Sequence, residues 1–423
     1  MNFNQIKNSE FVKNVITMLS GTTAGQFIAF LMLPVVARLY TPVQFGEYSL
    51  FISIASVIAV MASGRYELSI VLIKKDINAF NLFAICSLLI IVTAFLTYLL
   101  IFFSFDYLGF FFNNIDDYSW IIFIPFSVFL SASIQLFTYW YTRKKYFKVI
   151  SYGRFIQSAF TSVTFILLGY LNKGTMGLIL GSITGQFIFF MIIVVKILRE
   201  DYKSFKDINK QIIKEELYKN RNFPYYSMPM GFLNSISMNL LIYVLNIFYS
   251  VKMVGLYAKA NRVVNVPISL LTSAFTSVFY QNLSVTKRKL WLYKISYFSF
   301  LITGIIFMIP IIFWGESIFK FVLGDQWTNA GYIAKIIAPF IIFSFATSSV
   351  SNVYAVTKKN HIVLIWQLLY IVLALVIIYI FRYLSIYKLL FYFSLYGSFM
   401  YLLLAISGYY ILKKGVKEEQ FEK

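Results

Sequence analysis

The chain consists of long apolar segments of roughly 20 or more residues, separated by short polar gaps. A helix needs about 20 residues to cross ~30 Å of hydrocarbon, whereas the strands of a membrane barrel are about half as long and alternate. The first segment contains the sequence GTTAGQ and is too long for a signal peptide, so we expect it to be retained as a spanning helix. We therefore predict an all-α polytopic membrane protein with twelve spans, centred near residues 27, 60, 92, 130, 161, 186, 236, 268, 302, 343, 372 and 400.

Positive charge is concentrated in alternate gaps between these segments. Basic runs occupy residues 74–75, 143–148, 196–222, 287–289, 358–359 and 413–414, whereas the intervening gaps hold few Lys or Arg residues. Because cytoplasmic loops carry the excess of Lys and Arg, this alternation predicts that both termini are cytoplasmic. It also explains the net charge of +20 without nucleic-acid binding, since most basic residues mark cytoplasmic loops near anionic lipid headgroups.

The sequence also contains a short internal repeat. LYTPVQFGEY at 39–48 aligns with FYSVKMVGLY at 248–257, an offset of 209 residues, and each copy joins the first and second helices of a predicted six-helix half. Six spans separate the copies, so both halves should enter the membrane in the same direction. We therefore predict an N-terminal half at 1–198, a cytoplasmic basic linker at 199–222, a C-terminal half at 223–412 and a cytoplasmic tail at 413–423.

The first copy of the repeat lies in a polar elbow between two apolar segments. Tyr-Thr-Pro favours a turn because proline fixes φ and lacks an N–H donor, and Gly46 permits close packing of the next helix. The elbow has the pattern P-x-x-x-R-x-Y-x-P-x-x-F-G-x-Y, formed by Pro34, Arg38, Tyr40, Pro42, Phe45, Gly46 and Tyr48. This pattern resembles the first-loop signature of Wzx-type polysaccharide flippases, in the multidrug/oligosaccharidyl-lipid/polysaccharide exporter superfamily.

The resemblance implies a function as well as a fold. Flippases of this type move undecaprenyl-pyrophosphate-linked oligosaccharide repeat units, as in O-antigen synthesis, from the cytoplasmic to the periplasmic leaflet of the bacterial inner membrane. They are thought to use alternating access between two helical bundles, a cationic central cavity and ion coupling, as an antiporter does. The resemblance further implies membrane lipids as surroundings, a polysaccharide polymerase and a chain-length regulator as partners, and no cofactor.

Four charged residues fall inside predicted spans, where charge is costly and usually faces a cavity or a partner. Arg65 and Glu67 lie in the second span, and Lys259 and Arg262 share a face of the eighth. We expect Arg65, Lys259 and Arg262 to bind the anionic headgroup in a wet cavity, although each could instead snorkel to the membrane surface. Arg154 is a weaker candidate: it could enter the cavity from the inner side, but an anchor at the membrane interface is the more common role for such a residue.

Glu67 is a candidate for ion coupling or a partner for a cation on another helix. It is two residues from Arg65 and points roughly the opposite way on an ideal helix, so we do not expect a simple ion pair between them. Polar residues in the first helix of each half either line the substrate path or join helices. These candidates are Thr22, Gln26, Asn234 and Asn239.

Other functions are less consistent with the sequence. Asp116 and Asp117 could suggest a lipid-linked glycosyltransferase, but the predicted external loops leave no room for a folded acceptor domain, and a polysaccharide polymerase should have a large periplasmic loop. Single Cys86 and His361 residues predict no metal cluster. A multidrug exporter would favour acidic residues in the spans, and a lipid II flippase resembles a fourteen-span chain. We therefore expect a transporter and not an enzyme.

Overall fold

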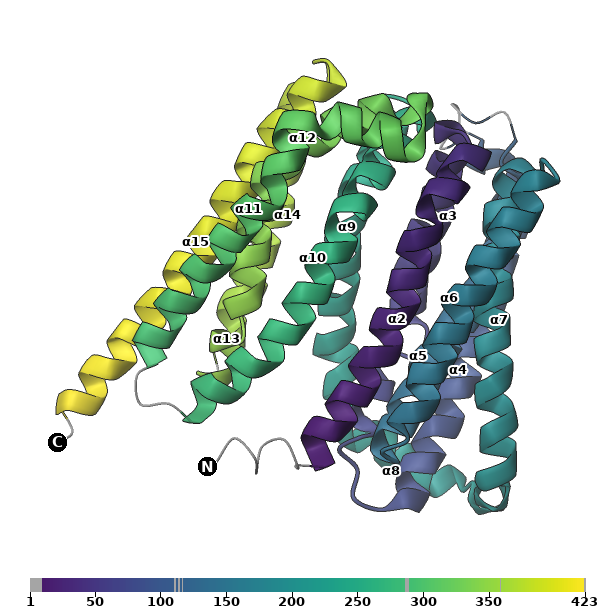
Figure 1. Cartoon of the computed structure of the whole chain (residues 1–423). Helices are drawn as coiled ribbons and strands as arrows, with labels where there is room; N and C mark the ends of the chain where they lie inside the picture. The colour runs from purple at the N-terminus through teal and green to yellow at the C-terminus, as the bar shows by residue number, and fades with distance from the viewer. Residues whose placement is uncertain are drawn as a thin grey trace. The chain divides into compact units, whose positions relative to one another are not determined.

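The computed structural model describes residues 10–109, 112, 115, 117–285, 289–357 and 359–421, and these residues form helices and no strand. Within this part of the chain, twelve helices have 20 or more residues, six before the short helix α8 (Lys210–Lys219) and six after it (Figure 1). The first six are α2 (Glu10–Leu39), α3 (Pro42–Met61), α4 (Asp76–Leu108), α5 (Ile124–Arg143), α6 (Phe147–Tyr170) and α7 (Gly174–Glu200). The second six are α9 (Met228–Phe248), α10 (Val251–Val285), α11 (Lys289–Leu323), α12 (Thr328–Val350), α14 (Asn360–Phe381) and α15 (Ile386–Phe421).

The length and composition of these helices are those of a multi-pass membrane protein. Nine segments in the described residues are both long and apolar enough to cross a bilayer, and a shorter apolar stretch covers residues 23–39 of α2. Helices α6 and α10 are not among the nine, although each has at least 24 residues. They carry Arg154, Lys259 and Arg262, so the less apolar helices are the ones with candidate substrate-binding cations.

The second predicted span is misplaced in the sequence interpretation. Helix α3 ends at Met61, and a 3₁₀ turn, η1 (Tyr66–Ser69), follows it before α4 begins. Gly64 and Arg65 both have a φ of 62°, in the left-handed region that cannot continue a right-handed helix. Arg65 and Glu67 therefore lie in the connection between two spans. The hydrophobic pattern had placed both residues inside the second span.

The two elbows of the internal repeat have the same local structure. Helices α2 and α9 end 209 residues apart, at Leu39 and Phe248, and α3 and α10 also begin 209 residues apart. The Thr41 hydroxyl accepts from the N–H of Gln44 at 3.4 Å, and the Ser250 hydroxyl accepts from the N–H of Met253 at the same distance. An N-cap of this kind satisfies a helix N–H that has no partner in the helix itself, so both copies start their second helix in the same way.

The chain forms two compact units, Met1–Gly255 and Leu256–Lys423. In the first unit, α6 packs between α2 and α7, while α4 packs on α5 and α9 packs on α3. In the second unit, α12 packs between α11 and α15, and α14 packs on α15. Residues 199–222, which we predict to link two halves, hold η3 (Tyr202–Asp207) and α8 and lie within the first unit.

The segment after α7 is attached to the first unit by buried polar groups. The Asp201 carboxylate is buried, accepts from the Trp140 indole N–H at 3.0 Å and pairs with Lys144. Glu216 of α8 is also buried and accepts from the side chain of Asn78 at 2.8 Å. Buried carboxylates are stable only when hydrogen-bonded or paired, so these contacts hold the segment against the ends of α4 and α5.

Candidate functional site

The connection between α3 and α4 places a buried carboxylate next to an arginine. The Glu67 side chain is 2% exposed, accepts a hydrogen bond from the Ser63 hydroxyl, and accepts a second from Gln135 Nε2 at 3.1 Å. Arg65 Nη1 lies 3.6 Å from Glu67 Oε1. The expectation that these two residues point in opposite directions is wrong, because the left-handed backbone at Arg65 replaces the helical geometry on which it rested.

Opposing influences act on the protonation of Glu67. Burial raises the pKa of the Glu67 carboxyl above its ordinary value, whereas the hydrogen bonds from Ser63 and Gln135 and the charge of Arg65 lower it. The increase from burial is the largest of these contributions, so the net change in the pKa of Glu67 is upward. Glu67 is therefore a carboxylate whose proton affinity depends on whether Arg65 and Gln135 stay in place.

Arg65 lies against a glycine of α9. A Cβ atom built on Gly231 would come within 3.0 Å of Arg65 Nε and 3.1 Å of its Nη2, so the guanidinium packs on the helix backbone. The Nε atom is buried and has no hydrogen-bond partner in the described part of the chain. Within the described residues, the Arg65 guanidinium thus makes one ion pair, with Glu67, and retains a donor that a second anion could use.

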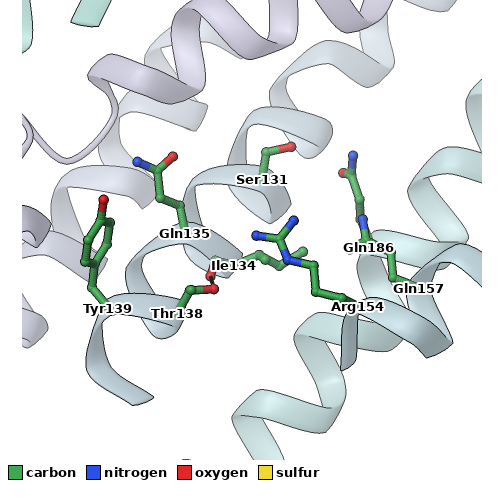
Figure 2. A pocket seen from close by; sticks show the side chains of 8 residues that line it. All are labelled: Ser131, Ile134, Gln135, Thr138, Tyr139, Arg154, Gln157 and Gln186. Carbon is green, nitrogen blue, oxygen red and sulfur yellow. Dashed lines mark hydrogen bonds between the residues drawn. The ribbon is translucent and has the colours of Figure 1, made fainter. Parts of the chain in front are cut away.

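A cavity of about 340 Å³ lies in the first unit among α5, α6 and α7. Its wall is polar, and Figure 2 shows side chains from the three helices converging on it. The lining residues are Ser131, Ile134, Gln135, Thr138, Tyr139, Arg154, Gln157 and Gln186. Seven of these eight side chains can form hydrogen bonds, which is unusual for neighbouring apolar spans and indicates a binding site for a polar ligand.

Arg154 is the one cation in the lining of this cavity. Its guanidinium extends from α6 toward the side chains of α5 (Figure 2), and its carbon Cζ lies 6.0 Å from the centre of the Phe189 ring. Among the described residues, no carboxylate lies within ion-pair distance of Arg154. Arg154 is exposed, so its guanidinium is open to an anion supplied by a ligand.

The buried carboxylate and the cavity share one side chain. Gln135 lines the cavity and donates its amide hydrogen to Glu67. Tyr139, also in the lining, is close enough to interact electrostatically with both Glu67 and Arg65. The connection after α3 and the cavity therefore form one continuous polar assembly in the first unit.

The two cations of α10 belong to the second unit and have different surroundings. Lys259 is buried, with its Nζ atom 4.6 Å from the centre of the Trp327 ring. Arg262 is exposed on the surface of that unit. The two residues were expected to share one face of the helix. Packing covers Lys259, whereas Arg262 remains open to a ligand within its own unit.

Three of the polar candidates have described side chains, and these three, Gln26, Asn234 and Asn239, are not in the lining of the cavity of α5, α6 and α7. Asn239 donates to the Ser235 carbonyl at 2.9 Å and lies 3.5 Å from the Ser56 hydroxyl of α3, so it joins two helices. Asn234 is exposed on α9, and Gln26 is half-buried in α2. Thr22 lies in α2, but its side chain is outside the described part of the structure.

The acidic pair considered for an enzyme is only partly described. Asp116 lies outside the described residues. Asp117 is exposed, and its Oδ1 atom accepts from the N–H of Ser119 at 2.8 Å, which lowers the pKa of the Asp117 carboxyl. In the described residues, no group of three or more His, Cys, Asp or Glu side chains could hold a metal ion.

Most of the cavity lining was missed in the sequence interpretation. Ser131, Gln135 and Thr138 follow a spacing of four and then three residues, so they form one polar stripe on α5. Gln157 follows Arg154 by three residues and falls on the same side of α6. Neutral polar residues at helical spacing are the sequence signal of these stripes, whereas charge within the spans and the internal repeat point to other residues.

The sequence and the fold were then compared with known proteins. A family model described as "Polysaccharide biosynthesis protein" matches residues 35–331. A search of curated proteins finds no match at the level of significance required.

Solved structures with a similar fold include membrane transporters. The lipid II flippase MurJ, in an inward closed conformation, gives a TM-score of 0.75 at 14% identity, with 93% of this chain and 87% of that chain covered. A multidrug resistance MATE family transporter of the MOP superfamily, in an inward-facing conformation, gives 0.63 at 14% identity, covering 95% and 96%. A MOP superfamily transporter from Pyrococcus furiosus gives 0.54 at 13% identity, covering 94% of each chain. These comparisons confirm the exporter fold that the elbow signature indicates.

Proposed function

Because this chain belongs to the polysaccharide biosynthesis protein family, we propose that it is a flippase for lipid-linked oligosaccharides. Its substrate is an undecaprenyl-pyrophosphate-linked repeat unit for a surface polysaccharide such as O-antigen, moved from the cytoplasmic to the periplasmic leaflet of the bacterial inner membrane. The observation that carries this proposal is the polar cavity of the first unit with its uncompensated Arg154, because a chain built only to pack in lipid has no use for such a site.

The chemistry of the candidate cations fits a lipid-linked anion. A pyrophosphate diester carries about two negative charges, and arginine binds such groups with two parallel hydrogen bonds. We propose that Arg65, Arg154 and Arg262 contact the headgroup or its first sugars, each supplying a guanidinium with free donors. Buried Lys259 contributes through its charge, since its ammonium lies over Trp327.

The proposed mechanism is alternating access between the predicted halves at 1–198 and 223–412. Both termini, the linker at 199–222 and the tail at 413–423 are then cytoplasmic. Ion coupling, of the kind found in an antiporter, would use Glu67, because protonation of this buried carboxyl changes the charge beside Arg65. A polysaccharide polymerase and a chain-length regulator would act on the exported units, so we propose them as partners. Transport, and not catalysis, is the activity.

Complementation tests this function directly. The chain is expressed in cells that lack their own polysaccharide flippase, and surface polysaccharide is measured together with the lipid-linked units that remain inside. We expect surface polysaccharide to return and the internal units to decrease. Continued accumulation inside, despite normal amounts of the protein in the membrane, would contradict the proposal.

Two matched controls separate this function from related transport. Rescue of cells depleted of their lipid II flippase would indicate a peptidoglycan precursor as the substrate. Increased resistance to cationic drugs, without any polysaccharide at the surface, would indicate multidrug export. Either result would exclude the oligosaccharide as the substrate only if the chain also fails to restore surface polysaccharide in cells that make the oligosaccharide it is expected to transport.

A further inference from the structure

The Glu67 carboxylate fixes which end of the Gln135 amide faces the cavity. An ionised carboxylate can only accept hydrogen bonds, so the amide NH₂ of Gln135 must point toward Glu67, and Nε2 lies 3.1 Å from Oε1. The carbonyl oxygen of Gln135 is then the end that remains for a ligand. This side of the cavity therefore presents a hydrogen-bond acceptor.

A second acceptor in the cavity has no donor. The Oε1 atom of Gln186 is buried and has no hydrogen-bond partner in the described part of the chain, although Gln186 lines the same cavity. A buried amide oxygen without a donor is unfavourable, and a hydrogen bond from a ligand hydroxyl would satisfy it. Gln135 and Gln186 come from α5 and α7, so the ligand must offer hydroxyl donors in two directions.

The size and charge of the cavity limit the ligand further. A volume of about 340 Å³ is near the lower end of the roughly 300 to 1,000 Å³ typical of small-molecule sites. It would hold one or two sugar residues and not a whole oligosaccharide. Arg154 supplies a single positive charge, whereas a pyrophosphate with about two negative charges would require more than one cation.

We propose that this cavity is a subsite for one acidic sugar residue of the transported oligosaccharide. The negative group of the sugar, a carboxylate or a phosphate monoester, pairs with Arg154, and its hydroxyl groups donate to Gln135 and Gln186. This inference rests on the proposed function for the origin of the ligand, but its chemistry is set by the cavity alone. The subsite would give the transporter a preference for oligosaccharides that contain an acidic sugar.

Ligand-induced stabilisation of the purified full-length protein tests the subsite. Thermal unfolding in detergent is measured in the presence of glucuronate, glucose 6-phosphate, glucose or inorganic pyrophosphate. Each compound is added over the same series of increasing concentrations. Because a ligand that binds the folded state raises the midpoint with its concentration, we expect glucuronate or glucose 6-phosphate to raise it and glucose to have little effect. The sugar that acts identifies the acid as a carboxylate or a phosphate.

Two variants assign the effect to the cavity. Arg154→Gln should remove the preference for acidic over neutral sugar while keeping a polar side chain of similar reach. Lys148→Gln is the matched control, because Lys148 is, like Arg154, an exposed cation of α6, but it is not part of the lining. Arg154→Gln could itself change the unfolding midpoint in the absence of ligand. In that case, binding of radiolabelled glucuronate is measured by equilibrium dialysis, at a temperature well below unfolding, in place of the midpoint shift.

The outcomes separate this inference from the proposed function. Equal stabilisation by glucose and both acidic sugars, no stabilisation by any sugar, or retention of the preference in Arg154→Gln would each overturn the subsite. Stabilisation by pyrophosphate alone would assign Arg154 to the headgroup and also overturn it. A chain that restores surface polysaccharide but fails these tests remains a flippase without this subsite.

Discussion

Gly46 and Gly255 pack backbone to backbone where the two repeated elbows meet within the first unit. A Cβ atom on Gly255 would lie 1.8 Å from the Pro42 carbonyl oxygen and 2.9 Å from the Gly46 nitrogen. Conversely, a Cβ on Gly46 would lie 2.0 Å from the carbonyl oxygen of Val251. The two glycines that align in the sequence repeat thus make reciprocal contacts, each with the start of the other elbow's helix.

This contact predicts that Gly255→Ala destabilises the protein. The atoms in the way belong to the backbone and cannot rotate aside, so the helices must separate, at a cost of about 1 to 3 kcal/mol. Thermal unfolding in detergent should show a lower midpoint. Gly304→Ala is the control, because the nearest atom to its Cβ would be a side-chain carbon of Phe345 at 3.2 Å, and the Ile342 side chain and Cα would lie at 3.6 and 3.7 Å. An equal midpoint for both variants would show that the elbows are loosely packed.

A second prediction concerns the buried carboxylate of the segment after α7. Asp201→Ala removes the acceptor of the Trp140 indole N–H and the partner of Lys144, which should cost about 1 to 3 kcal/mol for the unpaired buried donor. We expect proteases to cut residues 199–222 faster in this variant. Asp207→Ala, an exposed carboxylate of the same segment, should leave the rate unchanged. Equal rates in the two variants would mean that Asp201 does not hold the segment.

The structure explains which parts of the fold were predictable. Apolar segments long enough to span a bilayer gave twelve helices because hydrocarbon thickness sets their length directly. The end of α3 was missed because it depends on Gly64 and Arg65 taking left-handed φ angles within a stretch that remains fairly apolar. Hydrophobicity reports transfer into lipid and not backbone handedness, so it extended the span through both residues.

The candidate site was predicted less well, for a different reason. A charged residue such as Arg154 can be recognised in a span from its cost in lipid alone. Whether Gln157 or Gln186 faces a neighbouring helix or lipid depends on how α6 and α7 are rotated against each other, which one sequence does not specify. The pairing of Arg65 with Glu67 likewise follows from a local turn and not from helical periodicity.

A third prediction uses the raised pKa of Glu67. A carboxyl with a higher pKa in the folded chain binds its proton more tightly when folded, so its contribution to stability is complete below the unfolded pKa of about 4.3. That contribution is lost as the pH rises through the folded pKa. We expect the unfolding midpoint of the wild type to fall, relative to Glu67→Gln, as the pH increases above about 4.3. Parallel pH curves for the two proteins would contradict the assignment.

Arg65→Gln provides a directional check on the same titration. The positive charge of Arg65 lowers the pKa of Glu67, so its removal should raise that pKa further. The fall in stability should therefore extend to higher pH in Arg65→Gln than in the wild type. Tyr139 and Cys86, which interact with Glu67, ordinarily titrate near pH 10 and 8.5, above the window in which the wild-type difference begins. A window that stays where it is in the wild type would show that Arg65 is not coupled to Glu67.

The last prediction concerns transport itself. If guanidinium groups hold an anionic lipid headgroup, Arg65→Ala and Arg262→Ala should each abolish export, because loss of a bidentate charged contact removes binding that the remaining cations cannot replace. Surface polysaccharide is measured in the complemented cells, with the amount of membrane-inserted protein determined in parallel. Lys320→Ala is the matched control, because Lys320 is an exposed cation of the second unit that pairs with Asp325. Normal export by both arginine variants would exclude these residues from the headgroup site, and export lost equally in Lys320→Ala would point to total positive charge as the requirement.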